Sequence, residues 1–577
     1  MQVALFNNQT SRQKNRIQSD KATGQPHFSG AFTNAMNLIS KPLQGLDANP
    51  LVGVIVLDIL TAIAPNTIID TIKRNAIQGF ETFRRESSGL IINCILPGIA
   101  VIGAAFALKQ KVMGKEFNHI PVHKVWANTK SIDDGLSTWK EVSNIKDKDK
   151  RIEAFIKKSF EKVQCDDKSF MKIGTETEKE QAFKAKNEAI EELIKEIKTP
   201  SKKEEKGIKG FFIKVKNAIP GFKDTPAEID NKQLNKIHDK LAKAYGSSKN
   251  VIIQGADNKP LSTNMKNHIR NTFAFAHIFD DKSINSGNID KFAKKMKTLV
   301  GNKTLITMAG VGILALSMQA INRIITEKTT GRKGYAGYKN HNGEKIQTPE
   351  DKAKLNIGKA ISSAWFLTLG VLSMGKFGAK GQFDFAAPRT TMDQARILSL
   401  TTDIGRVNAA DEKNELKDTT VRDTIIFFNL YMAGDYISKG LVEGCQMRHK
   451  RKTGEDLNLF NKPAPINEKN KFKKFYKKIG AWVKGKSIKS FEEIEGTFVQ
   501  STKKSKAEIN QIRKNVVTAS NLMGLIYSLG ALGIAAPLLI ARMTNKNMEK
   551  ELAEAKKIKN GAYTSDSQKI NREILTR

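Results

Sequence analysis

The stretch Ser87–Leu108 reads SSGLIINCILPGIAVIGAAFAL, and the stretch Asn515–Ala541 reads NVVTASNLMGLIYSLGALGIAAPLLIA. Neither contains a charged side chain, over 22 and 27 residues respectively. A helix needs about 20 apolar residues to cross the hydrocarbon core of a bilayer. Both stretches are therefore predicted to span a membrane as helices.

Four weaker stretches extend this pattern. Thr304–Asn322 and Ala360–Gly375 are uncharged over 19 and 16 residues. Ala48–Ile69 is apolar except for Asp58, and Thr424–Gly434 is apolar but is followed by charged residues. The expected fold is mainly all-α: a polytopic helical membrane bundle of four to six spans, with a Lys-rich, mostly helical soluble insert and small β-hairpins.

The composition of the chain indicates an anionic partner. The 577 residues carry a net charge of +37, and the isoelectric point is about 9.8. Anionic lipid headgroups are the nearest candidate beside membrane spans, and an acidic protein is the other. Nucleic acid is not expected, because no nucleic-acid-binding module is recognisable. Cys94, Cys165 and Cys445 form no C-x-x-C pair, so neither a disulfide framework nor a cysteine-rich metal site is expected.

The distribution of apolar and basic residues predicts seven regions along the chain. They are a disordered basic tail (1–45), membrane helices (46–112), a soluble basic helical insert (113–300), membrane helices (301–445), a basic amphipathic and linker region (446–514), a membrane helix (515–541) and a charged C-terminal tail (542–577). Within the insert, Arg151–Val163 and Glu178–Ile197 have apolar residues at helical spacing. Val251–Ile253 before a turn predicts a short strand, and Asn342-Gly343 indicates a second hairpin.

A short motif occurs twice, in similar positions relative to apolar segments. Both copies read A-P-x-T-x-x-D, and each has a base three residues after the aspartate. The shared positions are Pro65, Thr67 and Asp70 in the first copy, and Pro388, Thr390 and Asp393 in the second. One interpretation is an internal repeat with function at the repeat interface, as many membrane proteins have. The other is ordinary helix chemistry, with Pro in a first turn and an acid paired to a base.

Asp58 and Asp435 are the candidate residues for a substrate or ion path. An acid inside a spanning helix is costly and usually faces the bundle interior or an aqueous route. Asp58 interrupts an apolar segment, and Asp435 follows one directly. The alternative is that neither segment spans the membrane.

Residues 480–487 match the phosphate-loop pattern G-x-x-x-x-G-K-[ST], but their context is wrong for a nucleotide site. Five lysines in residues 471–479 exclude the buried strand that should precede such a loop. Aromatic residues recur there at helical spacing among lysines, which is typical of a helix in the headgroup plane. The residues expected to contact lipid are Lys473, Lys474, Tyr476, Lys477 and Trp482. The alternative is a helix packed on the protein itself, with a solvated lysine face.

No catalytic constellation is visible, and no cofactor or metal is expected. His119 and His123 have the spacing of some zinc helices, but Pro121 lies between them. The sequence therefore favours a non-enzymatic membrane anchor or scaffold whose basic regions engage anionic lipid or an acidic partner. The alternatives are a transporter or channel that uses Asp58, and a helical pore former that inserts conditionally. The expected location is the cell (inner) membrane, with the basic regions in the cytoplasm.

Overall fold

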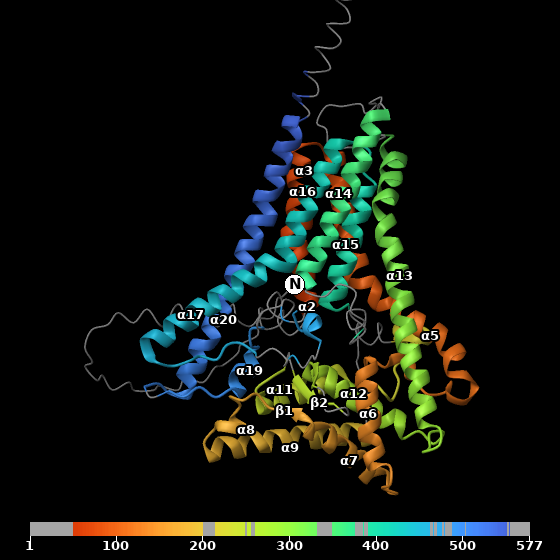
Figure 1. Ribbon diagram of the computed structural model, residues 1–577, viewed down its shortest axis with the longest axis vertical. Helices are drawn as coiled ribbons and strands as arrows, with labels where there is room; N and C mark the ends of the chain where they lie inside the picture. The colour runs from red at the N-terminus through yellow and green to blue at the C-terminus, as the bar shows by residue number, and fades with distance from the viewer. Residues whose placement is uncertain are drawn as a thin grey trace, which may run out of the picture.

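The computed structural model describes residues 50–199, 214–248, 251–255, 260–331, 349–374, 390–461, 470–475, 487–501 and 503–547, together with a few single positions. Almost all of these residues are helical. The helices form two parts: a bundle of long helices, and a compact domain below it (Figure 1). The long helices α5 (Leu96–Phe117) and α13 (Ile289–Thr330) have buried side chains in the cores of both parts, which joins the parts.

In the part of the chain that the structure describes, five helices are long and apolar enough to cross a membrane. They are Val52–Lys73, Ala76–Phe117, Ile289–Thr330, Asp351–Met374 and Lys506–Asn547. These helices contain both strong apolar stretches of the sequence, the two intermediate ones and most of the Asp58 segment. The sixth stretch, 424–434, lies in the bundle but is not among the five, because charged residues flank it closely on both sides.

Several of these long helices are built from successive pieces. The first consists of α2 (Pro50–Asp58), a π-helical turn η1 (Ile59–Ile63) and α3 (Ala64–Lys73). The second consists of α4 (Ala76–Leu90), η2 (Ile91–Ile95) and α5 (Leu96–Phe117). The helices α13 (Ile289–Thr330), α14 (Pro349–Met374) and α15 (Met392–Asn408) complete one side of the bundle. The other side contains α16 (Lys413–Phe428), η6 (Asn429–Ala433), α17 (Gly434–Thr453), α20 (Lys506–Ser528) and η7 (Leu529–Ala535).

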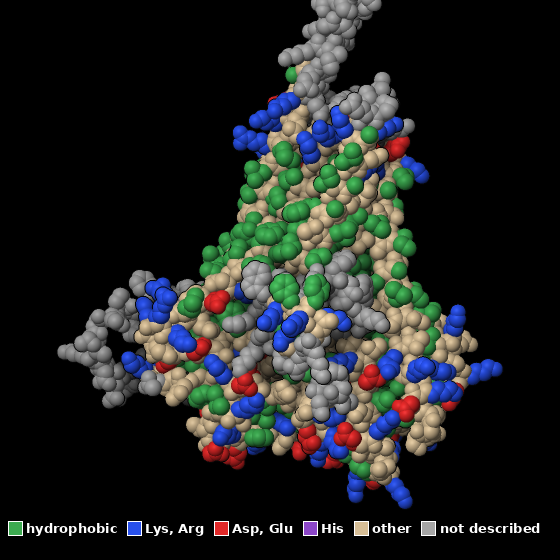
Figure 2. Space-filling model, viewed as in Figure 1, with side chains coloured by type: hydrophobic (Ala, Val, Ile, Leu, Met, Phe, Trp, Pro, Cys, Tyr) green, Lys and Arg blue, Asp and Glu red, His purple; other side chains and the backbone are tan. Residues whose placement is uncertain are grey.

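The outer surface of the bundle is apolar. Large side chains such as Ile72, Leu305, Ile313, Ile361 and Leu539 are each more than 60% exposed. Figure 2 shows hydrophobic side chains over the bundle, with Lys and Arg gathered at its far end and mixed charges over the compact domain. A soluble protein rarely exposes so extensive an apolar surface, whereas lipid covers it at no cost. The exterior is therefore compatible with a multi-pass membrane protein.

The compact domain has an ordinary water-excluding core. Its helices are α6 (Thr129–Val142), α7 (Lys148–Glu161), α8 (Phe170–Ile173), α9 (Glu176–Lys198), α11 (Asn231–Tyr245) and α12 (Met265–Phe279). Trp139 packs edge-on against Phe155, with ring centroids 5.3 Å apart, and both side chains are buried. The two windows predicted to be helical in this region correspond to α7 and α9.

A small antiparallel sheet lies on this domain, in the order β1-β2-β3. Its strands are β1 (Val163–Gln164), β2 (Val251–Gln254) and β3 (Pro260–Thr263). The strand predicted at Val251–Ile253 is thus present, and it pairs in register with β3. The second predicted hairpin, at Asn342-Gly343, lies outside the described residues.

A segment from the C-terminal third of the chain also belongs to the compact domain. Residues 487–500, which include α19 (Phe491–Gly496), pack against elements that precede them by more than 240 residues. The ammonium of Lys489 pairs with Asp166 at 2.9 Å, and both side chains are buried. Soon afterwards the chain enters α20, whose first turn is fixed by a capping box between Ser505 and Glu508.

If the five long helices span a bilayer, the protein will stay in the membrane pellet when membranes are washed with alkaline carbonate, and detergent will release it. The physical reason is that extraction without detergent would expose the apolar exterior of the bundle to water. Immunoblotting of pellet and supernatant measures this, with a peripheral protein as the control that must be released. Recovery of the chain in the carbonate supernatant would contradict the membrane assignment.

Candidate functional site

Four of the bundle helices widen into π-helical turns, and three of these turns share one cause. η1, η2 and η7 each end two residues before a proline: Pro65, Pro97 and Pro537. Proline has no N–H and its ring clashes with the carbonyl four residues earlier, so the preceding turn has to adjust. π-helical turns of this kind occur frequently at functional sites. The fourth, η6, precedes Gly434 and has no proline to explain it.

A small cavity lies where α2, η2 and η6 meet α15. Its volume is about 50 Å³, which is room for one or two water molecules. We call it the buried cavity; its lining residues are Val54, Asp58, Glu86, Gly89, Leu90, Asn93, Cys94, Ser399, Thr402, Asp403, Arg406, Ile426, Phe427, Leu430 and Tyr431. The lining thus combines apolar side chains with three carboxylates and a guanidinium.

The uncharged polar groups of this lining bond to one another. The Thr402 hydroxyl donates to the Asn93 side-chain oxygen at 3.0 Å, and the Asn93 amide donates to the Ser399 hydroxyl at 3.3 Å. The hydroxyls of Ser399 and Tyr431 are 2.8 Å apart. These bonds join η2, α15 and η6 around the cavity. The charged side chains of the lining take no part in them.

Two groups of buried charges occupy the interior of the bundle. The first, the four-charge cluster, consists of Asp70, Arg74, Asp418 and Arg422, whose side chains are at most 3% exposed. Arg74 contacts Asp70 at 3.2 Å and Asp418 at 2.7 Å, while Arg422 contacts the same two carboxylates at 3.2 and 3.5 Å. With two positive and two negative groups, this cluster is neutral.

The second group, the five-charge cluster, consists of Arg85, Glu86, Asp403, Arg406 and Asp423. Arg406 lies at its centre, 3.2 Å from Glu86, 3.0 Å from Asp423 and 3.9 Å from Asp403. Arg85 pairs with Glu86 at 2.9 Å. Three carboxylates therefore face two guanidiniums, which leaves a surplus of negative charge.

Asp58 adds a fourth carboxylate to this surplus. It ends α2 directly before η1 and lines the buried cavity with Glu86, Asp403 and Arg406. Within the described ranges, no hydrogen bond or ion pair engages the Asp58 carboxylate. The Asp58 side chain is half-buried and lies near Arg406 without a direct ion pair to it. Taking an unpaired carboxylate out of water is costly, which favours the binding of a proton or a cation there.

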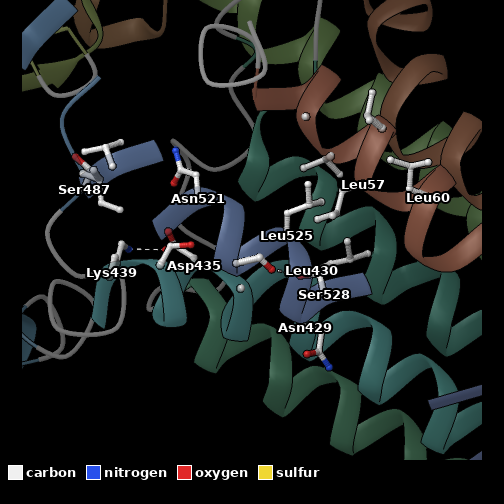
Figure 3. Close-up of a pocket in the computed structure, with 18 of the residues that line it drawn as sticks. Leu57, Leu60, Asn429, Leu430, Asp435, Lys439, Ser487, Asn521, Leu525 and Ser528 are labelled. Atoms are coloured by element: carbon white, nitrogen blue, oxygen red, sulfur yellow. Dashed lines mark hydrogen bonds and ion pairs between the residues drawn. The ribbon is translucent and has the colours of Figure 1, made fainter. Parts of the chain in front are cut away.

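Asp435, the other predicted acid, lies on a neighbouring cavity of about 480 Å³. We call it the interfacial cavity, because it lies between the bundle and the 487–500 segment and is open to the outside (Figure 3). The Asp435 carboxylate pairs with Lys439 at 2.5 Å and is 59% exposed. Val54 and Leu430 line both cavities, so the two cavities are neighbours.

The two copies of the A-P-x-T-x-x-D motif have different surroundings. Asp70 lies inside the four-charge cluster and accepts a bond from the Thr82 hydroxyl at 2.7 Å. Asp393 is in the first turn of α15 and pairs with Arg396 at 2.9 Å. Pro65 and Thr67 lie in α3, directly after η1.

In the second copy, the Thr390 hydroxyl donates to the Cys94 carbonyl of η2 at 3.2 Å. Pro388 lies outside the described residues. The described contacts therefore differ between the two copies, and their equivalence stays a prediction.

The lysine- and aromatic-rich segment is described only in part. Residues 471–475 form a helical turn that includes Lys473 and Lys474, while Tyr476, Lys477 and Trp482 lie outside the described residues. Phe472 and Phe475 are 72% and 60% exposed on this turn. Most of the phosphate-loop pattern, residues 480–486, also lies outside them.

The two histidines with zinc-like spacing have separate environments. His119 lies 3.1 Å from the Asp281 carboxylate, and His123 is buried in a short 3₁₀ turn. Burial, together with Lys109, Lys124 and Lys303, lowers the pKa of His123 to about 3, so its ring is neutral. No group of three metal-ligating side chains occurs among the residues that the structure describes.

Comparison with known proteins gave no assignment. No family model matches the chain, and neither a curated protein nor a solved structure matches it. The two charge clusters and the two cavities therefore provide the grounds for a functional proposal.

Removing one charge from the four-charge cluster should destabilise the bundle. Arg422→Met leaves Asp70 and Asp418 with only Arg74 as counter-charge, and breaking a buried ion pair costs about 3–5 kcal/mol. We expect a clearly lower melting temperature in detergent. Arg422→Met combined with Asp418→Leu removes one charge of each sign and should recover much of the loss.

The control is Lys297→Met, which breaks an exposed ion pair with Asp133 in the compact domain. Exposed pairs contribute about 0–1 kcal/mol, so this variant should melt like the wild type. If Arg422→Met also melts like the wild type, the cluster does not hold the bundle together.

Proposed function

We propose that the protein carries protons through its helical bundle, with Asp58 as the carboxylate that takes them up. The observation that carries the proposal is the surplus of carboxylates around the buried cavity. The four carboxylates of Glu86, Asp403, Asp423 and Asp58 outnumber the two guanidiniums of Arg85 and Arg406 beside them. Arg422 of the four-charge cluster also acts on Glu86 and Asp423. Ionisable groups inside membrane helices typically mark proton relays and ion paths.

A proton suits this site better than a larger ion does. The buried cavity has a volume of about 50 Å³, and in the described part of the chain no set of three side chains could coordinate a metal ion. A single proton needs only one carboxylate and a water molecule beside it. The uncharged lining groups, such as Thr402 and Tyr431, can orient that water.

The charged groups form a column along the bundle. Asp58 and Asp70 are twelve residues apart on one helix, which corresponds to about 18 Å at 1.5 Å per residue. Asp423 of the five-charge cluster and Arg422 of the four-charge cluster are adjacent in α16. A proton bound at Asp58 would therefore have ionisable groups between it and the end of the bundle that is remote from the compact domain.

The interfacial cavity supplies access from the other side. It is open to the outside and carries Asp435, and Val54 and Leu430 line it as well as the buried cavity. Leu430 belongs to η6, a π-helical turn, and such turns have weaker constraints on their backbone than regular helix. A shift of this turn would connect the two cavities.

Replacing Asp58 should abolish proton movement. Protein reconstituted in liposomes with an internal pH-sensitive dye is driven by a potassium diffusion potential, and acidification of the interior is recorded. Asp58→Asn should fall to the level of protein-free liposomes, because the amide cannot bind and release a proton. Asp58→Glu should retain part of the flux.

Asp133→Asn, at the surface of the compact domain, is the matched control and should leave the flux unchanged. Repeating the assay with and without sodium separates proton from cation movement. Equal flux from the wild type and Asp58→Asn would overturn the proposal.

A second function, membrane anchoring through basic surfaces, is supported by residues 471–475. Phe472 and Phe475 are exposed among lysines, and the chain carries a net charge of +37. Such a segment fits the anionic headgroups of a cytoplasmic leaflet, with an acidic protein as the other partner. We accordingly place the compact domain on the cytoplasmic side of the cell (inner) membrane.

A peptide covering residues 471–490 should bind anionic vesicles and not neutral ones. Each lysine near the surface contributes about 1 kcal/mol at low salt, so added salt should release the peptide. The fluorescence of Trp482 should shift to shorter wavelength on binding. The control peptide carries Phe472→Ser and Phe475→Ser, and it should bind more weakly and without a fluorescence shift. Equal binding of the unmodified peptide to anionic and neutral vesicles would argue against a headgroup site.

A further inference from the structure

The interfacial cavity has walls from four separate parts of the chain. α2 and η1 form one wall, η6 and α17 a second, α20 a third, and residues 487–489 the fourth. The lining elements α2 and α17 lie at the level where the bundle meets the compact domain (Figure 1). In a protein whose five long helices cross a bilayer, this level corresponds to the zone of lipid headgroups.

The lining of this cavity changes from polar to apolar along its length. In Figure 3, Ser487, Lys439, Asp435 and Asn521 gather at one end, while Leu57 and Leu60 lie at the other. Between them lie Leu430 and Leu525, with the polar side chains of Ser528 and Asn429 beside them. A cavity of about 480 Å³ is within the range of natural ligand sites, which is about 300–1,000 Å³. Its shape and lining suit a molecule with a polar head and an apolar tail.

The charges at the polar end indicate the kind of head. Lys489 also lines the cavity, but its ammonium is engaged by Asp166 at 2.9 Å and by the Thr497 hydroxyl at 3.0 Å. The polar end therefore offers one cation, Lys439, and one anion, Asp435. A ligand that carries one charge of each sign is complementary to this pair, whereas a purely anionic head would meet the Asp435 carboxylate.

The pair between Asp435 and Lys439 can be exchanged at little cost. It joins positions i and i+4 of one helix, and the Asp435 side chain is 59% exposed. The Lys439 side chain is 15% exposed. Ion pairs at this spacing on a helix surface contribute little to stability. A ligand ammonium can therefore replace Lys439 at Asp435, while Lys439 turns to an anionic group of the same ligand.

We propose that the interfacial cavity binds one phospholipid with a zwitterionic headgroup of the phosphatidylethanolamine type. Its ammonium pairs with Asp435, its phosphate accepts hydrogen bonds from Lys439, and one acyl chain lies along Leu57, Leu60 and Leu525. The ethanolamine ammonium donates directly to the carboxylate, which fits the partly exposed Asp435. The site does not depend on proton movement, because Asp58 is not part of it.

The test is a lipid titration of the full-length protein in detergent, followed by native mass spectrometry. Phosphatidylethanolamine, phosphatidylglycerol and diacylglycerol with identical acyl chains are compared. We expect phosphatidylethanolamine to bind at least about tenfold more tightly than the other two, a difference of about 1.4 kcal/mol. Asp435→Asn and Lys439→Gln should each remove this preference.

Two further variants make the result specific to the cavity. Leu525→Trp fills the apolar end and should abolish binding of all three lipids, whereas Asp133→Asn with Lys297→Gln, a distant exposed pair, should change nothing. Melting temperatures verify that each variant is folded. Equal affinity for the anionic and zwitterionic lipids, or lipid binding that survives both Asp435→Asn and Leu525→Trp, would overturn the proposal.

Discussion

The pairing of arginine with carboxylates inside an apolar bundle is the constraint on which the structure depends. Between helices in lipid, burial of apolar surface supplies little driving force, since lipid tails are as apolar as leucine. The four-charge cluster joins α3 to α16 through Arg74 and Arg422, and the five-charge cluster joins α4, α15 and α16 through Arg406. Each guanidinium has its partners at fixed positions on different helices, so these contacts set how the helices align.

The prolines also shape the interior of the bundle, because they change the backbone of the helices that surround it. Pro65 and Pro97 each follow a π-helical turn. The turn before Pro97 lines the buried cavity through Asn93 and Cys94, and the turn before Pro65 begins directly after Asp58, which also lines it. A widened turn carries an extra residue and displaces the side chains before it, which opens space that a regular helix would fill. The cavity therefore forms where the prolines loosen the helices, while the charge clusters hold the rest of the bundle in register.

How much of the bundle and of its charge clusters could be predicted from the sequence depends on how far apart along the chain the interacting residues lie. Lack of charge over 20 residues is a local property, so the long helices and the position of Asp58 within one of them could be predicted. Glu86 directly precedes the predicted span Ser87–Leu108, so the sequence indicates only a charged residue at the end of that span. Its partner Arg406 lies 320 residues away along the chain. No local pattern distinguishes Arg406 or Asp423 from the ordinary charges of a soluble helix, so their burial depended on a packing arrangement that the sequence does not display.

The attachment of the compact domain connects that domain to both cavities. Residues 487–489 line the interfacial cavity, and Lys489 is fixed to Asp166 of the domain by a buried ion pair. On the opposite wall, Val54 is four residues before Asp58 on one helix, so a displacement at that wall is carried directly to the carboxylate. The compact domain and the Asp58 helix therefore meet at the interfacial cavity, because residues 487–489 form one of its walls and Val54 and Leu57 of α2 form another.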